Sequence, residues 1–384
     1  MPVKTEVKPH VFNQVSLFAV YRTAVIRNDE VVRGILLPGL GPEHTAVRQA
    51  LDEWDGRWFV QESVHGTELT LVRAIARPGR ERWWLHILLA ALTLLTTTIS
   101  GAYFAGFVPL QMAILPIGPL GFPFPTRIFI GDLIAGLGFA LPLLGILLAH
   151  ELGHYLAARR HGMDVSPPYF VPAPHWLNLI GTFGAFIRLR SVMINRAVLM
   201  DVGAAGPVVS FLVSIPAVVL GLAWSTAAPI PMEFAQAPFV VVFDTQPVWL
   251  GGSLIFQLLA HWFGSDGSVL LLHPLAFAGW LGLFVTALNL FPLAQLDGGH
   301  ILFALGQRVQ RYASIAFLIL LLVLGYFWWG WWLWAALILV LGRGSIRHPA
   351  VFDPDFRVEG TRRWVGWACI LIFVLSFIPI PIRL

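Results

Sequence analysis

Long apolar runs separated by short polar stretches dominate the chain after residue 80. A helix needs about 20 apolar residues to cross the hydrocarbon core of a bilayer, and several of these runs are that long. We therefore predict a polytopic α-helical membrane protein with about six or seven spans between residues 83 and 384. The predicted spans are Trp84–Phe107, Ile130–Ala158, Ala197–Trp224, Val269–Phe291 and Trp364–Ile380, with a helical hairpin in Ser314–Leu341.

The hairpin in Ser314–Leu341 is favoured by charge. A single span there would place the arginines that follow it on the outer side of the membrane, against the positive-inside rule. Each arm of a hairpin, however, has only about 14 residues, fewer than the roughly 20 needed to cross a bilayer.

The first 80 residues have a different pattern. Val15–Ile26 and Val31–Leu37 are apolar or alternating, with a turn pattern between them. A helical spacing ending at Trp54 follows, and Trp58–Val64 and Glu68–Ile75 form a second strand pair. We predict a small soluble α+β domain, ββαββ, over residues 1–80. It has no catalytic pattern, so we expect a folded appendage or, alternatively, a regulatory or substrate-gating module.

Composition supports the membrane assignment. Hydrophobic residues make up 57% of the chain and charged residues 12%, with a net charge of +4. The basic residues are scattered between apolar runs, which indicates membrane topology and excludes a nucleic-acid surface. The single cysteine, Cys369, excludes an intrachain disulfide and a cysteine-rich zinc site.

Basic residues next to the spans predict the orientation. Arg73, Arg77, Arg80 and Arg82 precede the first span, and Arg159 follows the second, so these ends are expected in the cytosol. His150 lies nine residues before Arg159, or about 13 Å below the cytosolic surface at 1.5 Å per residue. The expected location is a bacterial plasma (inner) membrane, with a plastid membrane as the alternative, and a site reached from the cytosol.

The second span contains the sequence His150-Glu151-Leu152-Gly153-His154. Residues four apart lie on one face of an α-helix, so both imidazoles are expected to project together. This spacing suits two nitrogen ligands of one Zn²⁺, and Glu151 can take a proton from a water there. Ionisable groups in an apolar span are costly and usually functional. The alternative is a chance match on a buried helix.

A third ligand is expected from Asp297, which follows the fourth span and Pro292 and precedes two glycines. A zinc ion held by two histidines needs at least one more protein ligand, and a buried aspartate without a partner would be costly. The alternative is that Asp297 caps the helix that follows it.

The segment 162–196 cannot be a spanning helix, because it contains four prolines and then the run Gly181-Thr182-Phe183-Gly184-Ala185-Phe186. The alternation after Gly184 suits an extended strand. We expect either a surface hairpin or a re-entrant β-like loop beside the metal, since non-helical backbone at membrane depth must be covered by protein.

These motifs resemble the site-2 protease family of intramembrane zinc metalloproteases. HELGH and, about 140 residues later, the sequence from Asn289 to Gly298 (NLFPLAQLDG) are similar to its two signatures. The family is also resembled by Gly181–Ala185 and by the Ala205-Gly206-Pro207 turn. The run that begins at His273 and the N-terminal module are similar to its plant and cyanobacterial branch.

The resemblance implies a zinc endopeptidase with a metalloprotease core that cuts transmembrane or membrane-anchored proteins. His150, His154 and Asp297 would bind one Zn²⁺, and Glu151 would be the general base and then acid. Asn289 would stabilise the developing oxyanion. The substrate would bind as a strand to Gly181, Thr182, Phe183, Gly184, Ala185 and Phe186. His273 and His300 are alternative ligands or supporting groups.

Two other functions use the same residues. A zinc or proton transporter would employ these polar groups in the membrane, but we find no internal repeat of the kind typical of transporters. A non-catalytic scaffold that binds membrane helices would not need Glu151. The partners expected in every case are the lipid bilayer and a membrane protein, and the sequence does not define an oligomeric state.

Overall fold

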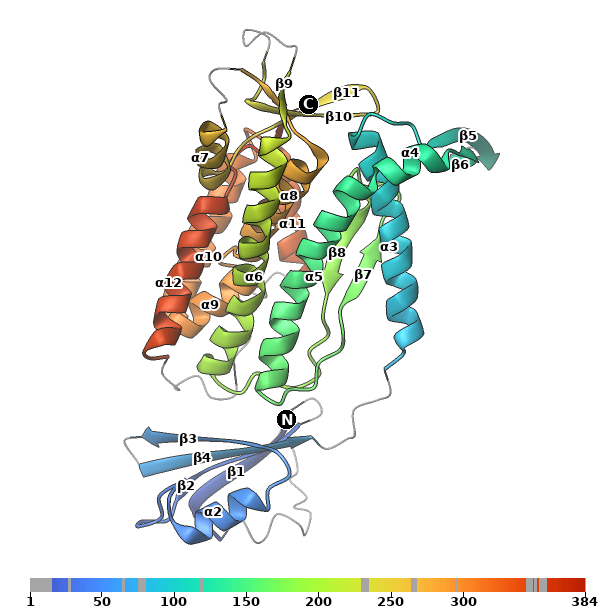
Figure 1. Ribbon diagram of the computed structural model, residues 1–384. Helices are drawn as coiled ribbons and strands as arrows, with labels where there is room; N and C mark the ends of the chain where they lie inside the picture. Colours follow the sequence, from blue (N-terminus) through green and yellow to red (C-terminus); the bar gives the residue numbers. More distant parts are fainter. Residues whose placement is uncertain are drawn as a thin grey trace.

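The computed structural model has a small α+β unit at the N-terminus and a tall helical body beyond it (Figure 1). The first fifteen residues and part of the predicted turn at 27–30 lie outside the described residues. The structure describes residues 16–26, 29–63, 66–74, 81–117, 120–228, 235–263, 268–293, 296–342, 348, 351 and 358–383.

The N-terminal unit is an antiparallel sheet with one helix. Its elements follow one another as β1 (Phe18–Ile26), β2 (Asp29–Leu36), α2 (Thr45–Asp52), β3 (Arg57–Ser63) and β4 (Gly66–Ala74), and the strands lie in the order β1-β2-β4-β3. Val47 and Leu51, one turn apart on α2, are buried against Leu69 and Leu71 of β4. Alternate strand positions and helix positions four apart thus supply one shared core.

Four helices among the described residues are long and apolar enough to cross a membrane. This is fewer than the six or seven spans predicted. The predicted fourth span gives only the 16-residue α8, because it begins at Pro274 and ends at Asn289, three residues before Pro292. The four helices are α3 (Trp83–Phe104), α5 (Leu137–Arg160), α6 (Arg196–Ala223) and α10 (Gln307–Leu324).

Shorter helices complete the body. The predicted hairpin in Ser314–Leu341 forms from α10 and the 12-residue α11 (Gly330–Leu341), and the 16-residue α12 (Thr361–Ser376) follows. The predicted second span is divided at Gly136 into α4 (Ile130–Ala135) and α5. Gly136 lies directly against α3, because a Cβ built at Gly136 would meet the Thr98 carbonyl at 1.9 Å.

Strands occupy the end of the body away from the N-terminal unit (Figure 1). A five-stranded sheet and the short helix α7 (Leu254–Trp262) lie there, and a two-stranded hairpin connects α3 to α4. The sheet contains β9 (Thr226–Ala227), β10 (Phe239–Phe243), β11 (Gln246–Leu250), β12 (Leu270–Leu271) and β13 (Ile382–Arg383), and the hairpin contains β5 (Leu110–Ile117) and β6 (Leu120–Ile128).

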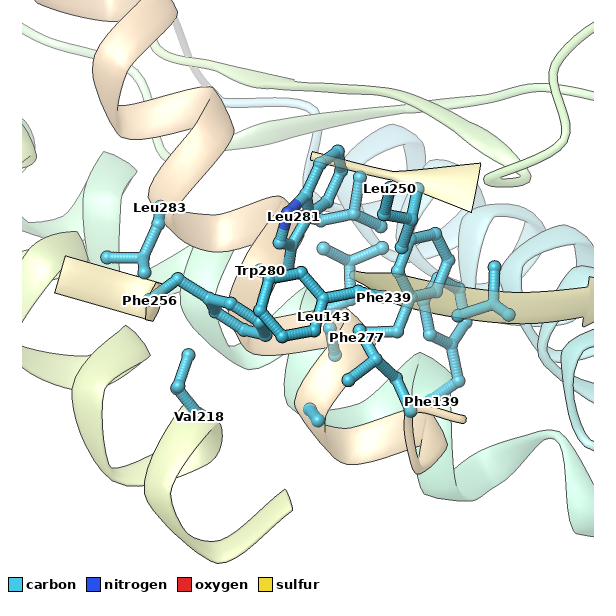
Figure 2. Packing of buried hydrophobic residues seen from close by; sticks show 14 of the residues in the cluster. Phe139, Leu143, Val218, Phe239, Leu250, Phe256, Phe277, Trp280, Leu281 and Leu283 are labelled. Atoms are coloured by element: carbon cyan, nitrogen blue, oxygen red, sulfur yellow. The ribbon is translucent and has the colours of Figure 1, made fainter. Parts of the chain in front are cut away.

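The largest apolar core joins the helices that carry the candidate site. Phe139 and Leu143 of α5 pack with Phe277 and Trp280 of α8, and Val218 brings in α6 (Figure 2). Phe139 and Phe277 stack with ring centroids 5.4 Å apart. Close packing of this kind holds neighbouring helices at fixed positions, so side chains further along α5, α6 and α8 can be placed accurately.

A second hairpin runs beside α3 and α5 (Figure 1). It consists of β7 (Tyr169–Pro172) and β8 (Thr182–Phe186), which pair antiparallel. Only the start of the alternation after Gly184 lies in a strand, because β8 ends at Phe186 and Ile187 and Leu189 lie beyond it. Gly181 has a φ of +84°, and a Cβ there would meet the backbone of Thr96 on α3 at 2.5 Å. The Thr96 hydroxyl donates a 2.7 Å hydrogen bond to the Gly181 carbonyl. The hairpin is therefore joined directly to α3.

Candidate metal centre

The two histidines of HELGH meet on one face of α5. His150 and His154 have ring centroids 4.7 Å apart, and their Nε2 atoms are separated by 3.0 Å. Both side chains are buried, at 4% and 8% exposure. The four-residue spacing on a regular helix thus brings two nitrogen lone pairs to one point, as the sequence predicts.

Asp297 reaches the same point from another part of the chain. It is the first residue of α9 (Asp297–Leu305), and its Oδ2 lies 3.4 Å from His150 Nε2 and 3.2 Å from His154 Nε2. Gly298 makes this approach possible, because a Cβ there would meet the Leu290 carbonyl at 1.9 Å. The chain therefore crosses closely over the end of α8 and presents the carboxylate to α5.

The three side chains are suited to a zinc ion. The ligand atoms of His150, His154 and Asp297 all lie within 4.8 Å of one another, and they form a group that could hold a metal ion. Two imidazole nitrogens and one carboxylate oxygen are a common protein ligand set for catalytic zinc, which keeps a further position for water or substrate. The clustering of these three groups agrees with the ligand set predicted from the sequence.

Backbone and hydroxyl groups orient the imidazoles. His154 Nδ1 lies 2.7 Å from the Val202 carbonyl, and His150 Nδ1 lies 3.1 Å from the Ser210 hydroxyl, both on α6. A carbonyl can only accept, so Nδ1 of His154 carries the proton and its Nε2 is free to bind metal. Ser210 has no sequence signal beyond a hydroxyl in an apolar span, so it was not among the predicted site residues.

Glu151 and Asn289 lie beside the three ligands. Glu151 is buried, and its carboxylate accepts a hydrogen bond from the backbone of Ile187, just beyond β8. Asn289, the last residue of α8, places its Nδ2 3.3 Å from His150 Nε2. A carboxylate and an amide donor are thus within reach of a group held at the histidines.

A cavity of about 290 Å³ opens next to these groups. Of the six residues predicted to bind substrate, only Ala185 and Phe186 line it, while Ile187 and Leu189 beyond the predicted range also do so. The other four residues do not line it. Gly181 packs on α3, and the Thr182 hydroxyl donates to the Val171 carbonyl. Phe183 is 59% exposed, and no atom lies within 4 Å of a Cβ built at Gly184. The cavity wall therefore lies at the end of β8 and in the residues after it, further along the chain than the sequence indicates.

The two other candidate histidines have different positions. His300 lines the cavity, and its Nδ1 lies 2.6 Å from Nε2 of His348, a partner that the sequence analysis missed. His273 precedes α8 at the end opposite Asn289, where its Nδ1 accepts a hydrogen bond from the Leu275 amide. His273 is therefore a helix cap and does not line this cavity.

Comparison with known proteins agrees with this geometry. The model of peptidase family M50 matches residues 138–326, a range that contains all three candidate ligands and Glu151. Just under half of the chain, residues 138–326, therefore resembles peptidase family M50, the site-2 proteases. This similarity agrees with two distant motifs meeting at one buried point.

Plant relatives support the family assignment. The chain is 29% identical over 323 residues to probable zinc metalloprotease EGY1, chloroplastic, from Arabidopsis thaliana, which covers 81% of this chain and 56% of the relative. It is 32% identical over 243 residues to probable zinc metalloprotease EGY2, chloroplastic, from Oryza sativa subsp. indica. That match covers 63% of this chain and 42% of the relative. The chain thus spans about half the length of the relatives it matches. No solved structure matches the chain.

The comparisons bear on the expected location. Four helices able to cross a membrane agree with a multi-pass protein of the M50 family. The expectation of a bacterial plasma membrane is not supported, because the relatives are named as chloroplastic.

Proposed function

We propose that this chain is an intramembrane zinc endopeptidase that hydrolyses peptide bonds within or near the transmembrane segments of membrane-anchored proteins. The observation that carries the proposal is the meeting of His150, His154 and Asp297 beside Glu151 at the wall of an open cavity. The names of the plant relatives, probable zinc metalloproteases, support the same activity.

Zinc bound by His150, His154 and Asp297 would supply Lewis-acid activation of water and of the scissile carbonyl. Glu151 is the base that removes a proton from the attacking water and then delivers it to the leaving amine nitrogen. Its side chain is buried, and the hydrogen bond from the backbone of Ile187 holds the carboxylate beside the ligands. Glu151 thus acts on the substrate without being a metal ligand.

Asn289 is positioned to stabilise negative charge. Its Nδ2 lies 3.3 Å from His150 Nε2, so the amide faces the point where the substrate carbonyl must lie to be attacked. A donor directed at the developing oxyanion contributes more in a buried site than it would in water.

The substrate binds as an extended strand along the β8 edge. Hydrogen bonds in a helix shield its peptide bonds, so a transmembrane substrate must open locally before attack. β8 pairs with β7 on one side, and the cavity wall begins at Ala185 and Phe186 at its end. Pairing with this strand would satisfy the opened backbone and present it to Glu151.

The membrane topology follows from charge. Residues 83–384 form the membrane-embedded protease domain, and residues 1–80 form a soluble domain on the side of the membrane that carries the basic residues. Arg159 and Arg160 end α5 next to the N-terminal unit, which supports this orientation. The site is then reached from this basic side, with β7 and β8 forming a re-entrant hairpin covered by α3 and α5.

The decisive experiment measures zinc content and cleavage with the same purified full chain. Wild-type protein in detergent should hold one zinc ion and cleave at least one member of a panel of single-span reporters with Gly- or Pro-containing spans. Glu151→Gln should retain zinc while cleavage falls about 10²–10⁴-fold. Glu53→Gln, at an exposed position of the N-terminal unit, is the matched control and should cleave normally.

The alternatives give different results. Cleavage by the Glu151→Gln variant at the wild-type rate would eliminate Glu151 as the base. Zinc transport into liposomes by a protein that cleaves no reporter would favour a transporter. Wild-type protein without zinc would eliminate the metalloprotease proposal.

A further inference from the structure

Two hydroxyl groups extend from the candidate metal centre into the helix core. The Ser210 hydroxyl on α6 lies 3.1 Å from His150 Nδ1 and 2.9 Å from the Thr286 hydroxyl on α8. Both side chains are fully enclosed, with exposures of 2% and 0%. His150 on α5 is therefore connected to the two other helices that the apolar core holds together.

The direction of these hydrogen bonds follows from the carbonyls at their far end. The Thr286 hydroxyl donates to the Gly282 carbonyl at 2.7 Å, and the Pro207 carbonyl lies 3.2 Å from the Ser210 hydroxyl. A carbonyl only accepts, so the Thr286 proton points to Gly282 and the Thr286 oxygen accepts the Ser210 proton at 2.9 Å, with the Pro207 carbonyl as a second, longer acceptor. The Ser210 oxygen is then the acceptor for a proton on His150 Nδ1, which leaves His150 Nε2 unprotonated.

The two histidines differ in how they are oriented. His154 is held by the backbone carbonyl of Val202, which no side-chain replacement removes. His150 depends on a side-chain hydroxyl, which is itself held by a second one. Partners of this kind set the tautomer and the ring orientation of a ligating imidazole.

We propose that Ser210, supported by Thr286, is the positioning residue that fixes the tautomer and orientation of His150 for zinc binding. The inference rests on the proposed function, since it assigns a role at the same metal centre. Ser210 touches neither substrate nor metal and acts only through His150.

Ser214 provides a matched comparison on the same helix. It lies one turn beyond Ser210 and is fully buried, and its hydroxyl donates to the Ser210 carbonyl at 2.7 Å. It fills space against Gly282, where a Cβ would meet its Oγ at 2.3 Å. Ser214 is thus a buried serine on the same helix as Ser210. Among the described residues, its hydroxyl makes no hydrogen bond to a histidine.

The test measures zinc affinity by competition with a chelator, using full-length protein and no substrate. Ser210→Ala should weaken zinc binding about 10–100-fold, whereas Ser214→Ala should leave it unchanged. Thr286→Val, which keeps the shape of the side chain, should cause a smaller loss. The double variant Ser210→Ala/Thr286→Val should bind zinc no more weakly than Ser210→Ala alone, since Thr286 acts through Ser210.

Thermal unfolding of the zinc-free proteins separates positioning from packing. Ser210→Ala and Ser214→Ala should lower the melting temperature to a similar extent. Equal zinc affinity of Ser210→Ala and wild type, or an equal loss in Ser214→Ala, would overturn the inference while leaving the proposed protease intact. Absence of zinc from the wild-type protein would instead overturn the proposed function.

Discussion

Gly206 lies directly against the imidazole of His154: a Cβ built at position 206 would meet His154 Nε2 at 2.2 Å. The same surface of α6 receives α5 closely, since a Cβ on Gly153 would meet the Ala205 carbonyl at 2.6 Å. The small residues of the Ala205-Gly206-Pro207 segment therefore permit both the approach of the two helices and the position of His154, a proposed metal ligand.

Replacement of Gly206 by alanine should displace His154 more than it disturbs the fold. The imidazole can rotate away from the added methyl group, but Nε2 then leaves the common point with His150. We expect the Gly206→Ala protein to fold and to bind zinc more than about tenfold more weakly. Zinc content and chelator competition on the purified protein measure this effect.

Gly145 supplies the control for that variant. It lies on α5, and no atom is within 4 Å of a Cβ built there. Gly145→Ala should keep the wild-type zinc affinity. A Gly206→Ala protein that binds zinc as tightly as Gly145→Ala would contradict the assigned role of Gly206.

Replacement of Asp297 by asparagine should remove the response of the protein to zinc. The amide keeps the size of the carboxylate but is a neutral and weaker ligand between the two imidazoles. A ligand that binds only the folded state raises its stability, by about 4 kcal/mol at a concentration 1,000 times the dissociation constant. Added zinc should therefore raise the melting temperature of the zinc-free wild type but not of Asp297→Asn. An equal rise in both proteins would exclude Asp297 as a ligand.

Acid should break an ion pair that ties the start of α3 to the segment after β8. Arg190 pairs with Glu81, whose side chain is 20% exposed, and this hydrogen bond lowers the pKa of Glu81 below its ordinary value of 4.5. A carboxylate whose pKa is lowered by folding stabilises the protein at pH values above its pKa in the unfolded state. This stabilisation is lost as the pH falls through its pKa in the folded state.

The corresponding measurement compares wild type with Glu81→Gln. The wild type should be more stable by about 1 kcal/mol near neutral pH. The difference should shrink as the pH falls below 4.5 and disappear once Glu81 is protonated in both states. Thermal unfolding of both proteins between pH 3 and 7 tests this, and a difference that is constant over the range would contradict it.

The N-terminal unit should protect the backbone of a segment that lines the cavity. Asp29, buried at the start of β2, accepts hydrogen bonds from Arg57 at 3.1 Å and from the backbone amide of Val192 at 3.0 Å. Met193, next to Val192, lines the cavity. Asp29→Asn should weaken this contact, so amide hydrogen exchange in residues 190–195 should become faster.

Asp52→Asn is the matched variant for that experiment. Asp52 is exposed on α2 of the same unit and should leave the exchange of residues 190–195 unchanged. If Asp29→Asn also left exchange unchanged, the N-terminal unit would not hold this segment.

Features of the site that depend on local spacing could be predicted from the sequence. HELGH predicted two imidazoles on one helix face because helical periodicity needs no information from elsewhere in the chain. The pairing of Asp297 with that helix followed from the cost of an unpartnered carboxylate and from family resemblance. The substrate-binding range was less well defined, since the alternation after Gly184 identifies a strand without indicating which part of it lines the cavity.

The sequence by itself determined that the chain is a membrane protein and which side chains are candidates for a metal. Apolar run length and residue spacing are local properties, and they are readable without a fold. Only the tertiary structure decided that Ser210 and Thr286 lie behind His150, that Ile187 reaches Glu151, and that Asp29 contacts the segment beside the cavity. These contacts join residues far apart in the chain, and their positions follow from how helices and strands pack together, which no single stretch of sequence encodes.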